Sequence, residues 1–502
     1  VKSPSSGVWL TVLGSRNYNI QSLPAIVDEP DGIYAIRSAD GPGGTNYTLK
    51  RICDFKLLDI RQPVPMRTRN RWLCTAQVWR DGALCPVVLR SDDDGVTWQW
   101  TVLETVAPFV ARYPHRGARW QQYSCEPTVV ERGDGSLLLI SRTSQDVHYF
   151  YESNDAGECW TSPVPSDCFH ATTTMPTLLR LRDGRILFFW CNTQPLPEVD
   201  HEGQPGCDDA IRQGVWEDVF TNRDACHAAI SEDEGRSWLG FCEVGLNEIR
   251  DHADYRSYLN SSINDKSVHQ FEAMELPEGK VLLVYGQAPS SRRMVIFDPA
   301  WLYERGNSED FSKGFARLST HVYVKSVSGG CAPGKIGHCA WNRTYGALLV
   351  PDPTNELREV LQLVTPDDPR LFNNRQGAAW NFPACRRGEV AVKLHIPGAG
   401  LRLTLTDRWF NPCDEYAGEL AQCSTVITRE MLPDTPFWSD AVLRWNLDVP
   451  VVTLSVNGGD ASPLELRLPV SPAGFSYLHL QTVSPERDYA GSLVSTLIQR
   501  AD

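Results

Sequence analysis

Three copies of one eight-residue pattern constrain the fold of this chain more than any other feature. The pattern is S-x-D-x-G-x-[T/S]-W, and it occurs at Ser91–Trp98, Ser153–Trp160 and Ser231–Trp238, with Cys159 as the one departure. In a tight turn the Asp accepts backbone N–H groups, the Gly takes a positive φ, and the Trp packs back over the turn. Each copy follows a strand-like run. The three copies therefore predict three strand–turn–strand units.

A second repeat lies upstream of these turns. It consists of an apolar run, an acidic residue followed by Gly, and another apolar run. The turns fall at Asp31-Gly32, Asp134-Gly135, Asp183-Gly184 and Glu278-Gly279. Each copy predicts a β-hairpin with a two-residue turn, and the wholly apolar strands indicate burial on both faces.

Joining hairpin to hairpin gives six four-stranded units, which begin near Asn19, Arg61, Cys125, Thr172, His269 and His338. Four-stranded units repeated in this way are typical of the blades of a β-propeller. After about Arg386 the repeat stops, and runs such as Val390–Ile396 predict the strands of a β-sandwich. We therefore predict an all-β chain, with a six-bladed β-propeller over residues 1–385 and a C-terminal β-sandwich domain over residues 386–502.

The charge of the chain limits its partners. Its 502 residues include 48 basic and 62 acidic side chains, for a net charge of -14. This balance argues against nucleic-acid binding, and an acidic ligand would have to be held by local arginines. No apolar run approaches the ~20 residues of a membrane span.

The sequence indicates no metal and no cofactor. It contains no loop of EF-hand spacing, no His-x-x-x-His cluster and no C-x-x-C pair. The 15 cysteines are an odd number, so at least one is unpaired. Whether the chain is secreted or cytoplasmic, and whether it forms a homodimer, stays open at this point.

Residues 15–365 resemble the sialidase (neuraminidase) superfamily, through the three octapeptides, which are called Asp boxes there, and the hairpin repeats. The resemblance implies the propeller fold. Asp boxes also occur in other propeller glycosidases, in lyases and in non-catalytic proteins, so the resemblance supports the fold more than the activity.

Blade topology predicts where a site would lie. The start of the first strand and the end of the second strand lie on the same face of the propeller, so residues at those places converge on one opening. The candidates are Arg37, Asp40, Arg61, Gln77, Arg80, Tyr123, Glu126, Arg142, His170, Asn192, His269, Glu272, Tyr285, Gln287, His338 and Asp352.

Glu126 and Arg142 form the sharpest pair among these candidates. The run from Cys125 through Asp134-Gly135 to Arg142 resembles the sialidase hairpin, which implies that Arg142 grips a substrate carboxylate and that Glu126 acts as a base. A planar guanidinium binds a carboxylate with two parallel hydrogen bonds. A carboxylate beside an arginine stays ionised and can take a proton. A purely structural pair that braces the end of the blade is the alternative.

The other candidates receive secondary roles. Glu272, His170 or Asp40 would be the acid, and Arg61, joined by Arg37 or Arg80, would complete a carboxylate clamp. The expected substrate contacts are Asn192, Gln287, Tyr285 and His338.

The sequence departs from the family at two positions. Ser22-Leu23-Pro24 stands where sialidases have Arg-Ile-Pro, and Gln270 and His338 stand where the nucleophilic Tyr is expected. Tyr123, close to Glu126, is the candidate substitute, since a phenol near a carboxylate can be activated. Without such a pair, a single displacement by water is favoured.

The leading hypothesis is an exo-acting glycoside hydrolase that removes a terminal acidic sugar, sialic acid first, from glycans. The alternatives are another carbohydrate-active propeller, either a neutral-sugar exo-glycosidase or a uronate lyase, and a glycan-binding propeller without catalysis.

Overall fold

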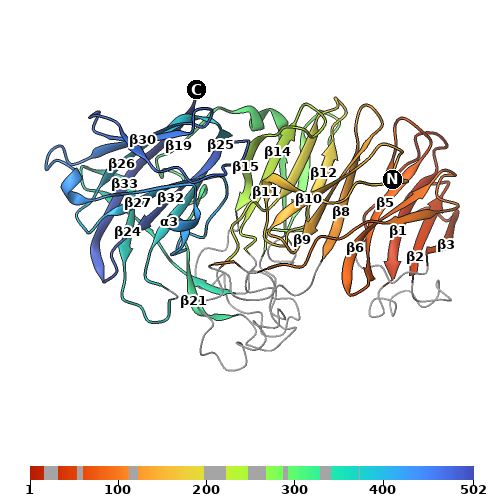
Figure 1. Cartoon of the computed structure of the whole chain (residues 1–502), viewed down its shortest axis with the longest axis horizontal. Helices are drawn as coiled ribbons and strands as arrows, with labels where there is room; N and C mark the ends of the chain where they lie inside the picture. The colour runs from red at the N-terminus through yellow and green to blue at the C-terminus, as the bar shows by residue number, and fades with distance from the viewer. Residues whose placement is uncertain are drawn as a thin grey trace.

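The computed structural model describes residues 1–15, 32–53, 60–110, 112–113, 123–196, 222–246, 267–286, 292–327, 341–371 and 373–502. Nearly all regular structure in these segments is β-strand. The helices among them are short: η3 (Pro299–Tyr303), α3 (Ala417–Leu420) and η4 (Arg429–Met431). Small sheets follow one another from the N-terminal end of the molecule, and larger sheets occupy the C-terminal end (Figure 1).

Five small antiparallel sheets make up the N-terminal part of the described residues. Their strand orders are β1-β2-β3, β4-β5-β6-β7, β11-β10-β9-β8, β12-β13-β14-β15 and β16-β17-β18. The strands are β1 (Trp9–Ser15), β2 (Gly32–Ser38), β3 (Tyr47–Cys53), β4 (Val64–Pro65), β5 (Trp72–Arg80), β6 (Ala83–Ser91), β7 (Gln99–Val102), β8 (Ser124–Glu131), β9 (Leu137–Thr143), β10 (Val147–Ser153), β11 (Val164–His170), β12 (Thr177–Arg180), β13 (Ile186–Trp190), β14 (Ala225–Ser231), β15 (Leu239–Leu246), β16 (Glu272–Glu275), β17 (Val281–Tyr285) and β18 (Arg293–Phe297).

The octapeptide turns have the geometry that their residue types predict. In the first copy, Asp93 accepts hydrogen bonds from the backbone N–H groups of Val96 and Thr97 at 3.1 and 2.8 Å. Gly95 has a φ of 78°, and the indole of Trp98 donates to the Gly95 carbonyl at 3.0 Å. The three turns join β6 to β7, β10 to β11 and β14 to β15, the third and fourth strands of their sheets.

A sandwich of two large sheets forms the C-terminal part. One sheet has the order β23-β24-β33-β26-β29-β30-β31, with β19 also paired to β33, and the other has the order β20-β25-β32-β27-β28. A separate pair is β21-β22. The strands are β19 (Gly306–Glu309), β20 (Leu318–Ser319), β21 (Val322–Val327), β22 (Trp341–Thr344), β23 (Leu348–Asp352), β24 (Asn355–Thr365), β25 (Gly377–Cys385), β26 (Arg387–His395), β27 (Leu401–Thr406), β28 (Cys423–Ile427), β29 (Ser439–Asn446), β30 (Val451–Val456), β31 (Ser462–Leu464), β32 (Phe475–Thr482) and β33 (Asp488–Ala501).

The burial patterns explain the two kinds of sheet. Along β26 every second residue is buried, so Val390, Val392 and Leu394 face the second sheet of the sandwich. In β9 and β13 all residues are buried, because neighbouring sheets cover both faces. The all-β class, with propeller-type sheets and a C-terminal sandwich, is therefore confirmed.

The first and last units differ in detail from the sequence prediction. The first hairpin, turning at Asp31-Gly32, falls partly outside the described residues, and β2 pairs with β1 on one side and β3 on the other. In the last unit β23 and β24 join β33, the final strand of the chain, instead of forming a separate sheet with β22. Tertiary pairing with residues more than 120 positions away decides this arrangement.

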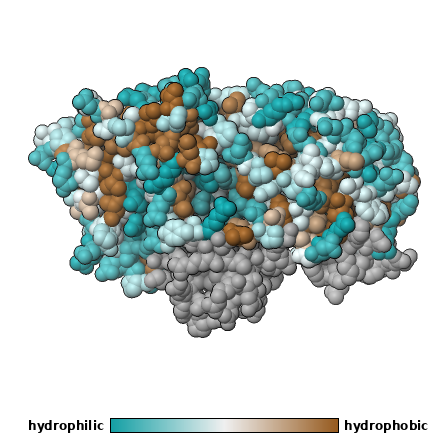
Figure 2. Space-filling model, viewed as in Figure 1, coloured by the Kyte–Doolittle hydropathy of each residue, from teal (hydrophilic) through white to brown (hydrophobic). Residues whose placement is uncertain are grey.

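The sandwich also takes strands from before residue 386. β19, β20 and β23–β25 belong to its two sheets, so the sheets extend across the predicted boundary between residues 385 and 386. The division of the chain into separate propeller and sandwich domains at this boundary stays a prediction. On the face shown in Figure 2, hydrophilic residues predominate, and apolar residues gather mainly over the sandwich. No helix in the described part of the chain is long and apolar enough to cross a membrane.

Candidate functional site

Glu126 and Arg142 form a buried ion pair at the open end of the β8–β9 hairpin. Arg142 Nη1 donates to Glu126 Oε2 at 2.8 Å, and the two side chains are only 11% and 10% exposed. The pair forms because Cys125 lies opposite Arg142 and the register shifts between Cys125 and Thr128, so that Glu126 turns toward the arginine. The two residues singled out in this hairpin are thus in direct contact, whereas their roles stay a prediction.

The backbone at Glu126 is strained, and a hydrogen bond from its N–H maintains this conformation. Its φ is 46°, a value that side chains other than Gly adopt at a cost. The side-chain oxygen of Gln77, on β5, accepts the Glu126 N–H at 2.6 Å. Thr173 and Gln270, which precede the first strands of the next two sheets, also have positive φ, at 46° and 63°. Strain of this kind is concentrated at functional sites.

Opposing effects act on the Glu126 carboxyl. Burial would raise its pKa, but the charge and hydrogen bond of Arg142, together with the charges of Arg223 and Arg61, hold the pKa below its ordinary value. Glu126 is therefore a carboxylate at neutral pH, able to accept a proton and unable to donate one.

Arg61 and Arg223 approach Glu126 from two other parts of the chain. Arg61 donates to the Pro176 carbonyl at 2.8 Å, and its Nη1 lies 3.9 Å from Glu272 Oε1. Arg223 is fully buried and donates to the carbonyl of Thr173. The positive charges of three arginines thus act on one carboxylate, although the chain as a whole is acidic.

A second group of charged side chains lies around Asp224, the residue that follows Arg223. Asp224 accepts hydrogen bonds from Arg343 Nη1 at 2.5 Å and from the Tyr323 hydroxyl at 2.9 Å. The Arg343 guanidinium lies 5.1 Å from the centre of the Tyr323 ring. His321 Nε2 lies 3.9 Å from Asp224. All four side chains are at most 3% exposed.

The sequence reasoning missed this group. Tyr323 is the second residue of β21, and Arg223 and Asp224 precede the third strand of their sheet, whereas the predicted site residues came only from the first and second strands of each unit. One available signal was the Arg-Asp dipeptide directly before the apolar run of β14.

Arg37, Asp40 and Arg80 lie apart from Glu126 and Arg142. Arg37 donates to the carbonyl of Asp94 at 2.7 Å and so supports the first octapeptide turn. Asp40 accepts the N–H of Asn46 at 3.2 Å, and that hydrogen bond lowers its pKa. Arg80 is exposed at the β5–β6 turn, 3.6 Å from Asp81. Each has a local structural partner, and we assign none of them to the site.

His170 and Asn192 lie where the small sheets meet the sandwich. His170 ends β11, the outer strand of its sheet, rather than starting the next sheet, and its Nε2 is 3.9 Å from Asp407 Oδ2. Burial and the charge of Arg408 lower the pKa of His170 to about 3, so it is no proton donor at neutral pH. Asn192 is fully buried and donates to the Asp407 carbonyl at 2.8 Å. Both are therefore left out of the acid and contact roles.

Of the remaining candidates, Tyr123, Glu272 and Tyr285 each have a different setting. Tyr123 is fully buried, with Arg142 5.4 Å from the centre of its ring. Glu272 is near Arg61, with 75% of its side chain exposed, and so stays available at the edge of the site. Tyr285 packs in the core between neighbouring sheets. Three residues belong to other settings or fall outside the description: Asp352 caps the β23–β24 turn, and Gln287 and His338 lie outside the described residues.

Among the described residues, no group of three or more His, Cys, Asp or Glu side chains is placed to hold a metal ion.

Part of the chain matches a known family model. Residues 33–244 match the model described as a BNR repeat-like domain. The matched part includes all three octapeptides, Glu126, Arg142 and Asp224. A search of curated proteins gives no match.

The solved structures similar to this chain include three sialidases. A mutant of NanB sialidase from Streptococcus pneumoniae is 15% identical with a TM-score of 0.35, over 54% of this chain and 37% of that chain. Trypanosoma rangeli sialidase is 12% identical with a TM-score of 0.31, over 98% and 79%. The intramolecular trans-sialidase from Ruminococcus gnavus, in complex with oseltamivir carboxylate, is 16% identical with a TM-score of 0.32, over 55% and 52%.

The present chain thus spans 37% of the length of NanB. TM-scores of this size do not establish a shared fold or activity, so the function is inferred from the residues of the site.

Proposed function

We propose that this protein is an exo-acting glycoside hydrolase that removes a terminal acidic sugar, sialic acid, from glycans. The observation that carries the proposal is the cluster of Arg61, Arg142 and Arg223 around Glu126, continued by the Tyr323–Asp224–Arg343 group. The match of residues 33–244 to a BNR repeat-like domain supports it.

The arginines are the reason for proposing an acidic sugar as the substrate. A carboxylate on the sugar is bound best by guanidinium groups in bidentate geometry. Arg142 and Arg61 are the two with partly accessible side chains, at 11% and 17% exposed. They form the clamp in this proposal, with Arg223 behind them. A neutral sugar would lack the carboxylate that these guanidinium groups bind and would bind more weakly.

Tyr323 is the proposed nucleophile. Its phenol donates to Asp224 and lies beside Arg343. Asp224 takes the phenol proton as the Tyr323 oxygen bonds to the anomeric carbon, and the positive charge of Arg343 stabilises the developing phenolate. Glu272, exposed at the edge of the site, takes a proton from solvent and passes it to the departing glycosidic oxygen. Water then displaces the phenolate, passing a proton to Glu272, and Asp224 returns its proton to Tyr323. The sugar leaves with retained configuration.

Glu126 has a different role in this route. As an ion-paired carboxylate it orients Arg142 toward the substrate. It is the base of the alternative route, in which it takes a proton from water in a single displacement and the sugar leaves inverted.

The test is hydrolysis of the 4-methylumbelliferyl glycoside of N-acetylneuraminic acid, followed by fluorescence and by proton NMR of the first anomer released. Turnover with retention supports the proposal with Tyr323 as nucleophile. Turnover with inversion supports the same substrate class, with Glu126 as the base of a single displacement instead of Tyr323 as the nucleophile. No turnover, in a protein shown to be folded, contradicts the hydrolase proposal.

A uronate lyase is the second candidate, because His321 and Tyr323 stand with ring centres 5.2 Å apart beside Asp224. A His and a Tyr near arginines can remove the proton next to a uronate carboxyl group. Formation of an unsaturated product absorbing in the ultraviolet, from a uronate-containing oligosaccharide, would favour this reaction over hydrolysis.

A further inference from the structure

A cavity of about 320 Å³ lies where β15 meets the sandwich. Its lining includes Glu243, Trp301, Glu304, Asn307, Arg317 and Asn381. β15 packs against β25 in this region, and the two strands are neighbours in Figure 1. The volume is in the range of small-ligand pockets. None of these residues belongs to the Glu126–Arg142 site.

The backbone of β15 is irregular on both sides of Glu243. The register of the β14–β15 pair shifts on both sides of this residue, at Phe241 and at Val244. Phe241 has a φ of 55°. The side chain of Asn381, 8% exposed, accepts the Glu243 N–H at 2.9 Å and donates to the Phe241 carbonyl at 3.1 Å. Bulges of this kind re-aim side chains and are common next to sites.

A buried chain of hydrogen bonds supports the Glu243 carboxylate from behind. The Asn192 N–H donates to His227 Nδ1 at 3.0 Å, so the ring carries its proton on Nε2. His227 Nε2 lies 2.5 Å from the Tyr477 hydroxyl, which donates to Glu243 Oε1 at 2.6 Å. Burial lowers the pKa of His227 to about 3, and burial with the charge of Glu243 raises the pKa of Tyr477. Both groups are therefore neutral, and Glu243 is a fixed acceptor.

The opposite wall combines amide, guanidinium and indole groups. Asn307 donates to the Asn381 carbonyl at 2.8 Å and accepts from Arg317 Nη1 at 3.0 Å. Trp301 adds an aromatic surface. Carboxylate and amide groups around an indole suit the hydroxyl groups and the apolar ring face of a sugar. Glu243 and Glu304 would repel a sugar that carries a carboxylate.

We propose that this cavity is a second carbohydrate site, which binds an uncharged or amino-substituted hexose of a glycan. It differs in charge from the proposed catalytic site, because Glu243 and Glu304 line it with Arg317 in place of the arginine cluster. The inference does not depend on the hydrolase proposal: the cavity would bind its hexose whether or not the protein cleaves sialosides.

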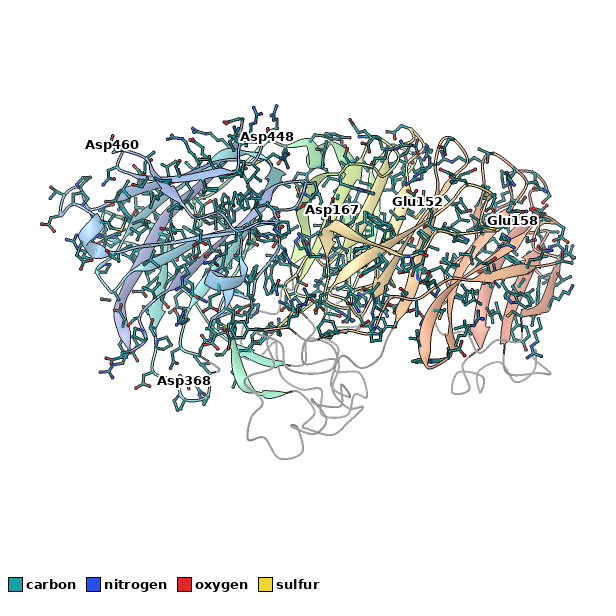
Figure 3. The ribbon with its side chains drawn as sticks, viewed as in Figure 1. Glu152, Glu158, Asp167, Asp368, Asp448 and Asp460 are labelled. Carbon is teal, nitrogen blue, oxygen red and sulfur yellow. The ribbon has the colours of Figure 1, made fainter. Side chains whose placement is uncertain are left out.

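The test is saturation-transfer difference NMR with the methyl glycosides of glucose, galactose, mannose and glucosamine, and with free N-acetylneuraminic acid. The wild-type protein and the Glu126→Gln variant should both show transfer to at least one hexoside. Glu243→Gln and Trp301→Ala should weaken its affinity at least tenfold. Asp460→Asn, at the far end of the sandwich (Figure 3), is the matched carboxylate control and should bind as the wild type does.

Several results would overturn the proposal. Transfer to none of the four hexosides would do so, and so would equal binding by the wild type, Glu243→Gln and Trp301→Ala. Because Trp301 adjoins the core, its variant counts only if its thermal unfolding matches that of the wild type. Glu243→Gln keeps an acceptor oxygen for Tyr477 and serves as the second, milder variant. Loss of hexoside binding in Glu126→Gln would instead place the sugar in the arginine-rich site.

Discussion

Tyr323 donates a hydrogen bond to Asp224 at 2.9 Å across 99 positions of sequence, in the same group as the Arg343 guanidinium. A buried phenol bonded to a carboxylate and flanked by an arginine is chemically different from an ordinary core tyrosine. The carboxylate can take the phenol proton, and the arginine lowers the energy of the phenolate. This relationship gives the proposed site a nucleophile that the first strands of the sheets do not supply.

Replacement of Tyr323 distinguishes it from Tyr123. We expect Tyr323→Phe to lower kcat for the sialoside by about 100-fold or more, since the nucleophilic oxygen is lost. Tyr123→Phe should change kcat less than about threefold, because Tyr123 offers its ring to Arg142 and the ring remains. Steady-state kinetics on both purified variants gives the answer. The reverse order of effects would restore Tyr123 as the candidate.

Loss of the Glu126–Arg142 pair should lower activity without unfolding the protein. We expect Arg142→Ala to raise KM and lower kcat/KM by about 100-fold or more, through loss of the charge-assisted contact to the substrate. Glu126→Gln should lower kcat by about tenfold if Glu126 orients Arg142, and by about 100-fold or more if it is the base.

The control for this pair is Glu389→Gln. Glu389 accepts a hydrogen bond from Arg444 at the same distance of 2.8 Å, but on the sandwich. Its kinetics should match those of the wild type. Wild-type kinetics in both Arg142→Ala and Glu126→Gln would show that the pair only braces the blade.

The three octapeptide turns should contribute unequally to stability. Asp93 accepts two backbone N–H groups and the Thr97 hydroxyl at 2.6 Å, and Asp233 has the same contacts with Ser237. Asp155 has Cys159 at that position instead of a hydroxyl residue. We expect Asp93→Ala to lower the unfolding free energy by about 1–2 kcal/mol, and Asp155→Ala by less. Urea unfolding measures both, and equal losses would contradict the role of the hydroxyl.

Buried histidines should make the protein sensitive to mild acid. Burial lowers the pKa of His148 and His227 to about 3 and the pKa of His479 to about 4. Between the ordinary value of 6.5 and these values, the unfolded chain binds protons that the folded protein does not. Stability is therefore full above about pH 6.5 and falls as the pH drops, by about 1.4 kcal/mol per pH unit for each histidine. Urea midpoints that stay constant from about pH 7 to about pH 5 would contradict this expectation.

Local signals explain what could be predicted from the sequence. The Asp-Gly turns and the octapeptides specify hairpins within a few residues, and the hairpin around Asp134-Gly135 places Cys125 opposite Arg142, next to Glu126 in the register shift. The all-β class follows from the same repeats.

Tertiary pairing explains what could not be predicted. His170 was expected at the start of a sheet, but it ends the outer strand of the preceding one, because strand order is set by packing between sheets. β23 and β24 pair with the last strand of the chain. Asp224 contacts Tyr323 and Arg343, which are distant from it in the sequence, so no local spacing predicts these contacts.

The central claim is tested most directly by incubating the wild-type protein with the 4-methylumbelliferyl glycoside of N-acetylneuraminic acid, and with the corresponding neutral galactoside, at equal concentrations. The account predicts release of 4-methylumbelliferone from the sialoside only, because the proposed clamp of Arg142 and Arg61 binds the carboxylate of the sugar. Release from the galactoside alone, or from neither glycoside by a folded protein, would contradict it.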